Sequence, residues 1–180
     1  MIVGDVSKHV LFALQNHPKH KFYLTGSRYF DTYLPMSDWD FFAEETREVK
    51  LFLVTSLGFR PDPRAHHDIS YTGGVQPRIL LLKSGDIHVQ LVPSESINEK
   101  LAAQQFLFDN GIIKDIASKN SEMSVRKILN HSAWDTAVLV VRKAITPASD
   151  PFFPGDGSKQ FQNSVKPVDT IPKPNRKMEW

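Results

Sequence analysis

The sequence predicts an α+β fold, in which helices pack mainly on one face of a mixed β-sheet and a long C-terminal helix is followed by a Pro-rich tail. Helical and strand-like apolar patterns alternate over the first third of the chain. Two strand patterns around Lys83-Ser84-Gly85-Asp86 then predict an antiparallel hairpin. A 3.6-residue apolar period over residues 123–145 predicts the longest helix. Strands that alternate with helices, then an antiparallel hairpin and then further helices favour the α+β class with a mixed sheet.

The first half of the chain reads as helix, strand, helical turn, strand and helix. An apolar stripe over residues 5–17 that stops before Pro18 predicts the first helix. The second helix is bounded by Thr46 as N-cap and Gly58 as the stop. The strands between them are bounded by turn residues, and Pro35 ends the helical turn. The expected segments are a helix over 5–17, a strand over 21–26, a turn over 28–34, a strand over 38–43 and a helix over 46–57.

The second half begins with a segment rich in Pro, Gly and His, residues 59–77, which we expect to be mostly loop with a short strand at 68–71. Within it, His66, His67 and Asp68 have the residue types of a metal site. Adjacent side chains point apart in extended structure, so a polar loop is favoured. The expected hairpin strands cover 78–83 and 86–92, and the expected helices cover 97–110, after a cap at Ser94 or Ser96, and 123–145.

The composition predicts one domain over residues 1–145 and a Pro-rich C-terminal tail over residues 146–180. The tail holds half of the 12 prolines and shows no apolar period, so we expect it to be irregular or extended. The lack of cysteine excludes disulfides and thiolate metal sites. A net charge of +2 gives no strong electrostatic case for nucleic acid. The apolar run Val10–Leu14 is too short to be a signal peptide or a membrane span, so we expect a soluble, cytoplasmic protein without membrane association.

The residues that suggest chemistry are Gly26-Ser27, at the end of the first strand, and the pair Asp38 and Asp40 that follows. Two aspartates at i and i+2 share one face of a strand and repel each other unless a cation lies between them. A Gly-Ser turn that ends a strand and opens a helix offers backbone N–H groups to a phosphate. Phosphate and divalent metal held together suggest metal-assisted nucleotidyl transfer.

The motif Gly26-Ser27, followed after a gap by Asp38-x-Asp40, resembles the DNA polymerase beta-like nucleotidyltransferase superfamily, in particular small bacterial and phage nucleotidyltransferases. The strand 87–92, followed by Pro93, matches the family's third motif. The resemblance covers about residues 20–93 and implies a nucleotidyltransferase-like sheet. It implies Mg²⁺ or Mn²⁺ held by Asp38 and Asp40, and an NTP whose phosphates contact Gly26, Ser27 and Arg28.

Two residues depart from the family pattern. His88 occupies the position of the third carboxylate, and the resemblance makes it a catalytic residue, either a metal ligand or a general base. Imidazole is a poor ligand for Mg²⁺, which prefers oxygen donors, whereas manganese or zinc accepts it better. Asp31 stands where relatives often have glycine, and its carboxylate either repels the incoming triphosphate or faces solvent.

Two functions remain open on these residues. The first is a metal-dependent nucleotidyltransferase that moves a nucleoside monophosphate from an NTP to a hydroxyl of RNA such as tRNA, of a protein or of a small molecule. The second is a catalytically degenerate binding protein on the same scaffold, in which the tail docks on a protein partner through Phe152 and Phe153.

Overall fold

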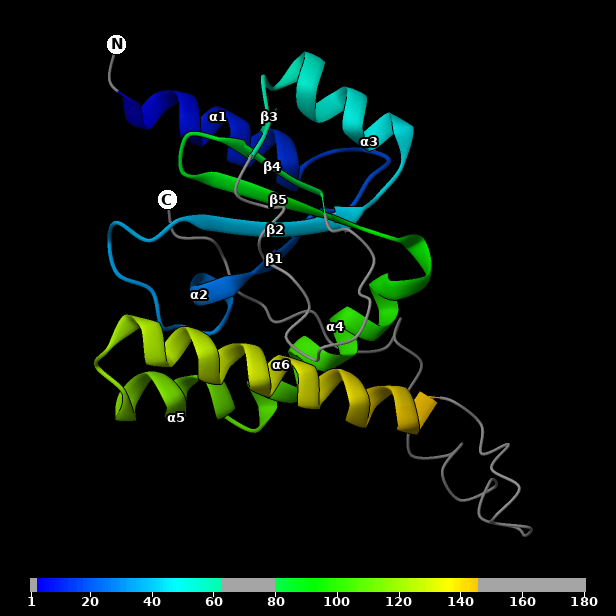
Figure 1. The fold of residues 1–180 in the computed structure, drawn as a ribbon. Coiled ribbons are helices and arrows are strands. Elements are labelled where there is room, and N and C mark those ends of the chain that lie inside the picture. Colours follow the sequence, from blue (N-terminus) through cyan, green and yellow to red (C-terminus); the bar gives the residue numbers. More distant parts are fainter. Residues whose placement is uncertain (1–2, 63–79, 146–180) are drawn as a thin grey trace, which may run out of the picture.

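A five-stranded mixed sheet forms the centre of the fold, with the strand order β1-β2-β5-β4-β3 (Figure 1). The structure is a computed structural model, and it describes residues 3–62 and 80–145. Strands β2 and β5 are parallel, and the other three neighbouring pairs are antiparallel. The strands are β1 (Tyr23–Thr25), β2 (Trp39–Glu44), β3 (Arg60–Pro61), β4 (Leu80–Ser84) and β5 (Ile87–Val92).

Six α-helices and one π-helical segment surround this sheet in the described part of the chain. They are α1 (Val3–Gln15), α2 (Gly26–Tyr29), α3 (Arg47–Leu51), the π-helix η1 (Phe52–Ser56), α4 (Ser94–Asp109), α5 (Ile112–Lys119) and α6 (Met123–Ile145). The α+β class, with a mixed sheet and a long helix α6, is confirmed. None of the described helices is both long and apolar enough to cross a membrane.

Several elements differ in detail from the expected ones. The helix expected over 46–57 is capped by the Thr46 side chain, which accepts from the Val49 backbone N–H, but its second half is π-helical. The helical turn expected over 28–34 is the four-residue helix α2, which begins at Gly26 and ends before Phe30. Neither β3 nor α5 was expected. The expected strand at 68–71, the loop with His66, His67 and Asp68, and the tail over 146–180 lie outside the described residues.

The main core lies between the sheet and the helices α1, α3 and η1, which cover one face (Figure 1). The side chains on this face of β2 and β5 alternate with those on the other face, as strand geometry requires. They are apolar and fully buried: Phe41, Ala43, Val89 and Leu91. Burying a Phe, Val or Leu side chain stabilises the fold by roughly 1.5–3 kcal/mol. This face therefore carries stability rather than chemistry.

A second apolar cluster joins α4, α5 and α6 with Tyr29 and Phe30 at the end of α2. Helix α4 crosses the sheet face opposite to α1, where the Gln104 side-chain amide donates a hydrogen bond to the Leu24 carbonyl oxygen at 3.0 Å. Near the beginnings of β2 and β5, the side chains of Asp40 and His88 point to this same face, and they are 33% and 18% exposed. The polar residues of interest are therefore accessible to a ligand.

Candidate functional site

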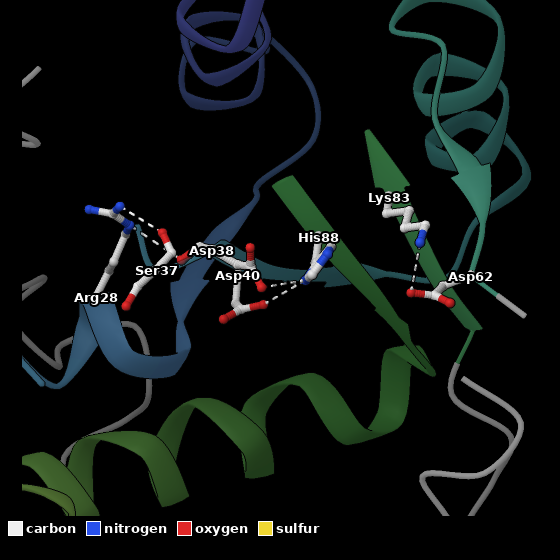
Figure 2. Close-up of polar contacts among 7 residues, drawn as sticks. All are labelled: Arg28, Ser37, Asp38, Asp40, Asp62, Lys83 and His88. Atoms are coloured by element: carbon white, nitrogen blue, oxygen red, sulfur yellow. Dashed lines mark hydrogen bonds and ion pairs between the residues drawn. The ribbon is translucent and has the colours of Figure 1, made fainter. Parts of the chain in front are cut away.

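The pairing of the strands brings the predicted site residues into one row across the sheet. In the parallel pair β2 and β5, Asp40 lies directly opposite His88. On the outer sides of this pair, Thr25 of β1 lies opposite Asp40, and Lys83 of β4 lies opposite His88. Directly opposite residues share one face of a sheet. Figure 2 shows Asp40, His88 and Lys83 along this row, with Asp38 beside Asp40.

The imidazole of His88 contacts both aspartates. Its Nδ1 lies 3.3 Å from Asp40 Oδ1 and 3.9 Å from Asp38 Oδ2 (Figure 2). The hydrogen bond with Asp40 raises the pKa of His88, and the negative charges of Asp40, Asp38 and Asp62 act in the same direction, while burial opposes them. Charged His88 therefore supplies a positive charge beside the two carboxylates.

Gly26 brings the Gly-Ser turn into direct contact with Asp40. Its φ is +65°, a left-handed conformation that side chains disfavour. A Cβ built on Gly26 would lie only 2.5 Å from Asp40 Oδ2, so the carboxylate occupies the space that a side chain would need. Ser27 follows as the second residue of α2. The structure therefore brings Gly26-Ser27 and Asp40 together although 14 positions separate Gly26 from Asp40 in the sequence.

Arg28 holds the loop that leads into Asp38. Its Nη2 donates to the Ser37 carbonyl oxygen at 2.7 Å, and its Nε donates to the Asp38 carbonyl oxygen at 3.2 Å (Figure 2). The guanidinium carbon also lies 4.0 Å from the ring centroid of Trp39 and 4.8 Å from that of Tyr33. Arg28 thus positions the backbone at Asp38 in this structure, and its contact with a phosphate stays a prediction.

Asp31 adopts the left-handed conformation, with φ of 56°, which explains why glycine suits this position. Its Oδ2 lies 3.5 Å from Nζ of Lys114 on α5. The carboxylate that departs from the family pattern is therefore balanced by a lysine of α5.

Asp86, two residues before His88 in the sequence, lies in the hairpin turn and accepts a hydrogen bond from Ser7 of α1 at 3.1 Å. Asp86 is thus tied to the helix on the opposite face of the sheet.

Three residues near the row were not identified from the sequence. Lys83 Nζ lies 3.4 Å from Oδ2 of Asp62, a carboxylate that is 3% exposed just after β3 (Figure 2). Lys100 of α4 donates a hydrogen bond to the Gln90 side chain at 2.8 Å, and Gln90 is two residues after His88 on β5. The hairpin pattern could have indicated that Lys83 faces His88, but Asp62 and Lys100 arrive only through tertiary packing.

The donor set fits a metal ion that takes part of its ligands from a substrate. Within residues 3–62 and 80–145, no three His, Cys, Asp or Glu side chains are arranged to hold a metal ion by themselves. Mg²⁺ usually keeps several waters and binds through one or two carboxylates together with substrate phosphates. Asp40, which lies against the Gly26 turn where a phosphate is expected, and Asp38, which lies with it at His88, fit that mode of binding.

Comparison with known proteins gives little more than a distant structural likeness. No protein-family model matches the chain, and no curated protein matches it. A solved structure, the conserved protein GrpB from Enterococcus faecalis, is similar over 78% of this chain and 90% of that chain, with a TM-score of 0.43 and 16% sequence identity. A likeness at this level identifies neither a family nor an activity for this chain.

Proposed function

We propose that the chain is a nucleotidyltransferase, which moves a nucleoside monophosphate from an NTP to a hydroxyl acceptor. The observation that carries this proposal is the close approach of Gly26 to Asp40, because it combines a turn suited to phosphate with a carboxylate pair suited to a divalent ion. The acceptor is a hydroxyl of RNA, protein or a small molecule.

In this proposal, Asp38 and Asp40 hold Mg²⁺ or Mn²⁺, which when bound neutralises negative charge on the triphosphate. The backbone N–H groups of Gly26 and Ser27 bind the phosphates, and Arg28 keeps Asp38 in position. The acceptor hydroxyl attacks the α-phosphorus, the bond from that phosphorus to pyrophosphate breaks, and His88 takes the hydroxyl proton in the neutral form that it adopts above its raised pKa. His88 suits this role because it lies at the row and is partly exposed.

The direct test is the transfer of label from each α-labelled NTP in turn to total tRNA and to a cell lysate, with Mg²⁺ and with Mn²⁺. We expect label on a discrete acceptor with the wild-type protein and none with the double variant Asp38→Asn, Asp40→Asn. The matched control is Asp31→Asn, since Asp31 is also an aspartate but pairs with Lys114 on α5. Unchanged transfer by the double variant, or no transfer by the wild type under either metal, contradicts the proposal.

A second candidate is a degenerate binding protein, in which charged His88 replaces the metal and the tail docks on a protein partner. The observation that favours it is the contact of His88 Nδ1 with both aspartates. His88→Asp separates the two candidates, because it restores the third carboxylate that the resemblance implies. This change raises transfer if the chain is a weak enzyme, and it has no effect on transfer if the chain is only a binding protein.

A further inference from the structure

Lys100 brings a positive charge to the sheet face that carries the candidate site. It lies on α4, the green helix that runs below the row in Figure 2, and its Nζ donates to Gln90 Oε1 at 2.8 Å. Gln90 follows His88 by two residues on β5, so the two side chains point to the same face about 6.5–7 Å apart along the strand. The ammonium therefore lies on the face that carries the candidate site, beside the Phe42–Gln90 pair, which is two residues along the strands from the Asp40–His88 row.

The side chains seen in contact with this ammonium are neutral. Its Nζ lies 5.2 Å from the ring centroid of Phe42 and 5.7 Å from that of Trp134, and the side chain is partly buried. None of the ion pairs seen among residues 3–62 and 80–145 includes Lys100. Burial lowers the pKa of Lys100 to about 8, the direction expected for an ammonium that forms no ion pair.

A partly buried ammonium without a counter-charge is unfavourable, and an anion that binds beside it would relieve this cost. Phosphate is the natural choice of anion here, because lysine is a common phosphate ligand that acts as a point charge. The rings of Phe42 and Trp134 limit hydration of the ammonium, which strengthens its attraction for an anion. The amide of Gln90 fixes its position.

We infer that Lys100 binds a phosphate group of the nucleotide at the Asp40–His88 row, which assigns to α4 a part in recognising the triphosphate. This inference rests on the proposed function for its substrate, but it concerns the binding of phosphate and not the transfer of a nucleotide. The inference extends the candidate site from the sheet and the Gly26 turn to helix α4.

The test measures binding of inorganic tripolyphosphate to the full chain by titration calorimetry, without divalent metal. We expect the wild type to bind, and Lys100→Met, which removes the charge but keeps the length of the side chain, to bind about tenfold more weakly. Lys100→Arg keeps the charge and should restore most of the affinity. The control is Lys119→Met, since Lys119 lies on α5 and pairs with Asp115 one turn away.

The melting temperature of each variant without anion separates a binding role from a structural one. If Lys100→Met binds tripolyphosphate as tightly as the wild type, or if it melts at a lower temperature without losing affinity, Lys100 only packs α4 and the inference is wrong. Absence of binding by the wild type also overturns it. If tripolyphosphate binding depends on Lys100 but the protein transfers no nucleotide, the inference is supported and only the proposed function is contradicted.

Discussion

The two faces of β2 and β5 differ although they belong to the same strands. One face presents Phe41 and Val89, which are 1% and 0% exposed beneath α1 and α3. The other presents Asp40 and His88, which are partly exposed and contact each other. Because side chains alternate along a strand, Asp40 and its neighbour Phe41 serve opposite purposes, chemistry for Asp40 and stability for Phe41. The comparison teaches that substitutions at adjacent positions should separate folding from function.

The largest expected effect belongs to the buried face. Phe41→Ala leaves a cavity in the main core and should lower the free energy of unfolding by about 3–5 kcal/mol. Asp40→Asn, one residue away, should cost less than about 2 kcal/mol, because Asp40 is partly exposed and the amide keeps its size. Urea unfolding followed by circular dichroism measures both. Equal losses at the two positions contradict the separation of the faces.

An intermediate effect is expected at Gly26, where the polar face meets the backbone. Gly26→Ala and Gly85→Ala both put a side chain into a left-handed conformation, at about 1–3 kcal/mol each. Only Gly26→Ala also drives a methyl group against Asp40, since a Cβ at Gly85 meets nothing within 4 Å. We expect the larger loss of stability for Gly26→Ala in thermal unfolding. A loss no larger than that of Gly85→Ala argues against a tight contact between the turn and the carboxylate.

The smallest effect is the dependence of stability on pH through His88. Its pKa is raised in the folded protein, chiefly by the hydrogen bond with Asp40, so its charged form stabilises the fold. This stabilisation is present in full below the ordinary pKa of about 6.5 and is lost as the pH rises through the raised value. Asp40→Asn should lower the pKa of His88 in an NMR titration of the metal-free protein. Asp31→Asn should leave that titration unchanged, and an equal shift in both variants points to a general charge effect.

The fold was predicted where the apolar patterns are long. The strands β2 and β5 and the helices α1, α4 and α6 follow clear periods, so local sequence was enough to find them. The two-residue strand β3 is too short to show alternation, and it forms because its backbone pairs with β4. Helix α5 begins after Gly111, whose positive φ separates it from α4, and the spacing of Ile112 and Ile116 was its weak signal.

The candidate site was predicted as separate motifs, and the structure shows how they meet. Sequence spacing named Gly26, Asp40 and His88, but the contact of Gly26 with Asp40 depends on the register of β1 with β2, and that of Asp40 with His88 on the register of β2 with β5. The role of Arg28 in holding the loop at Asp38 was not anticipated, because it depends on the path of residues 30–38. Lys100 reaches the face only through the packing of α4, which no local pattern encodes.

The parallel pairing of β2 with β5 also bears on when the site comes into existence during folding. The antiparallel neighbours of this pair, β1 with β2 and β4 with β5, are close in sequence, whereas Asp40 and His88 are 48 residues apart. Closing the longer loop has the higher entropic cost, so partly folded chains that contain both local pairs still lack the site. A ligand that binds at the row therefore recognises only the complete sheet and selects it from all less folded states.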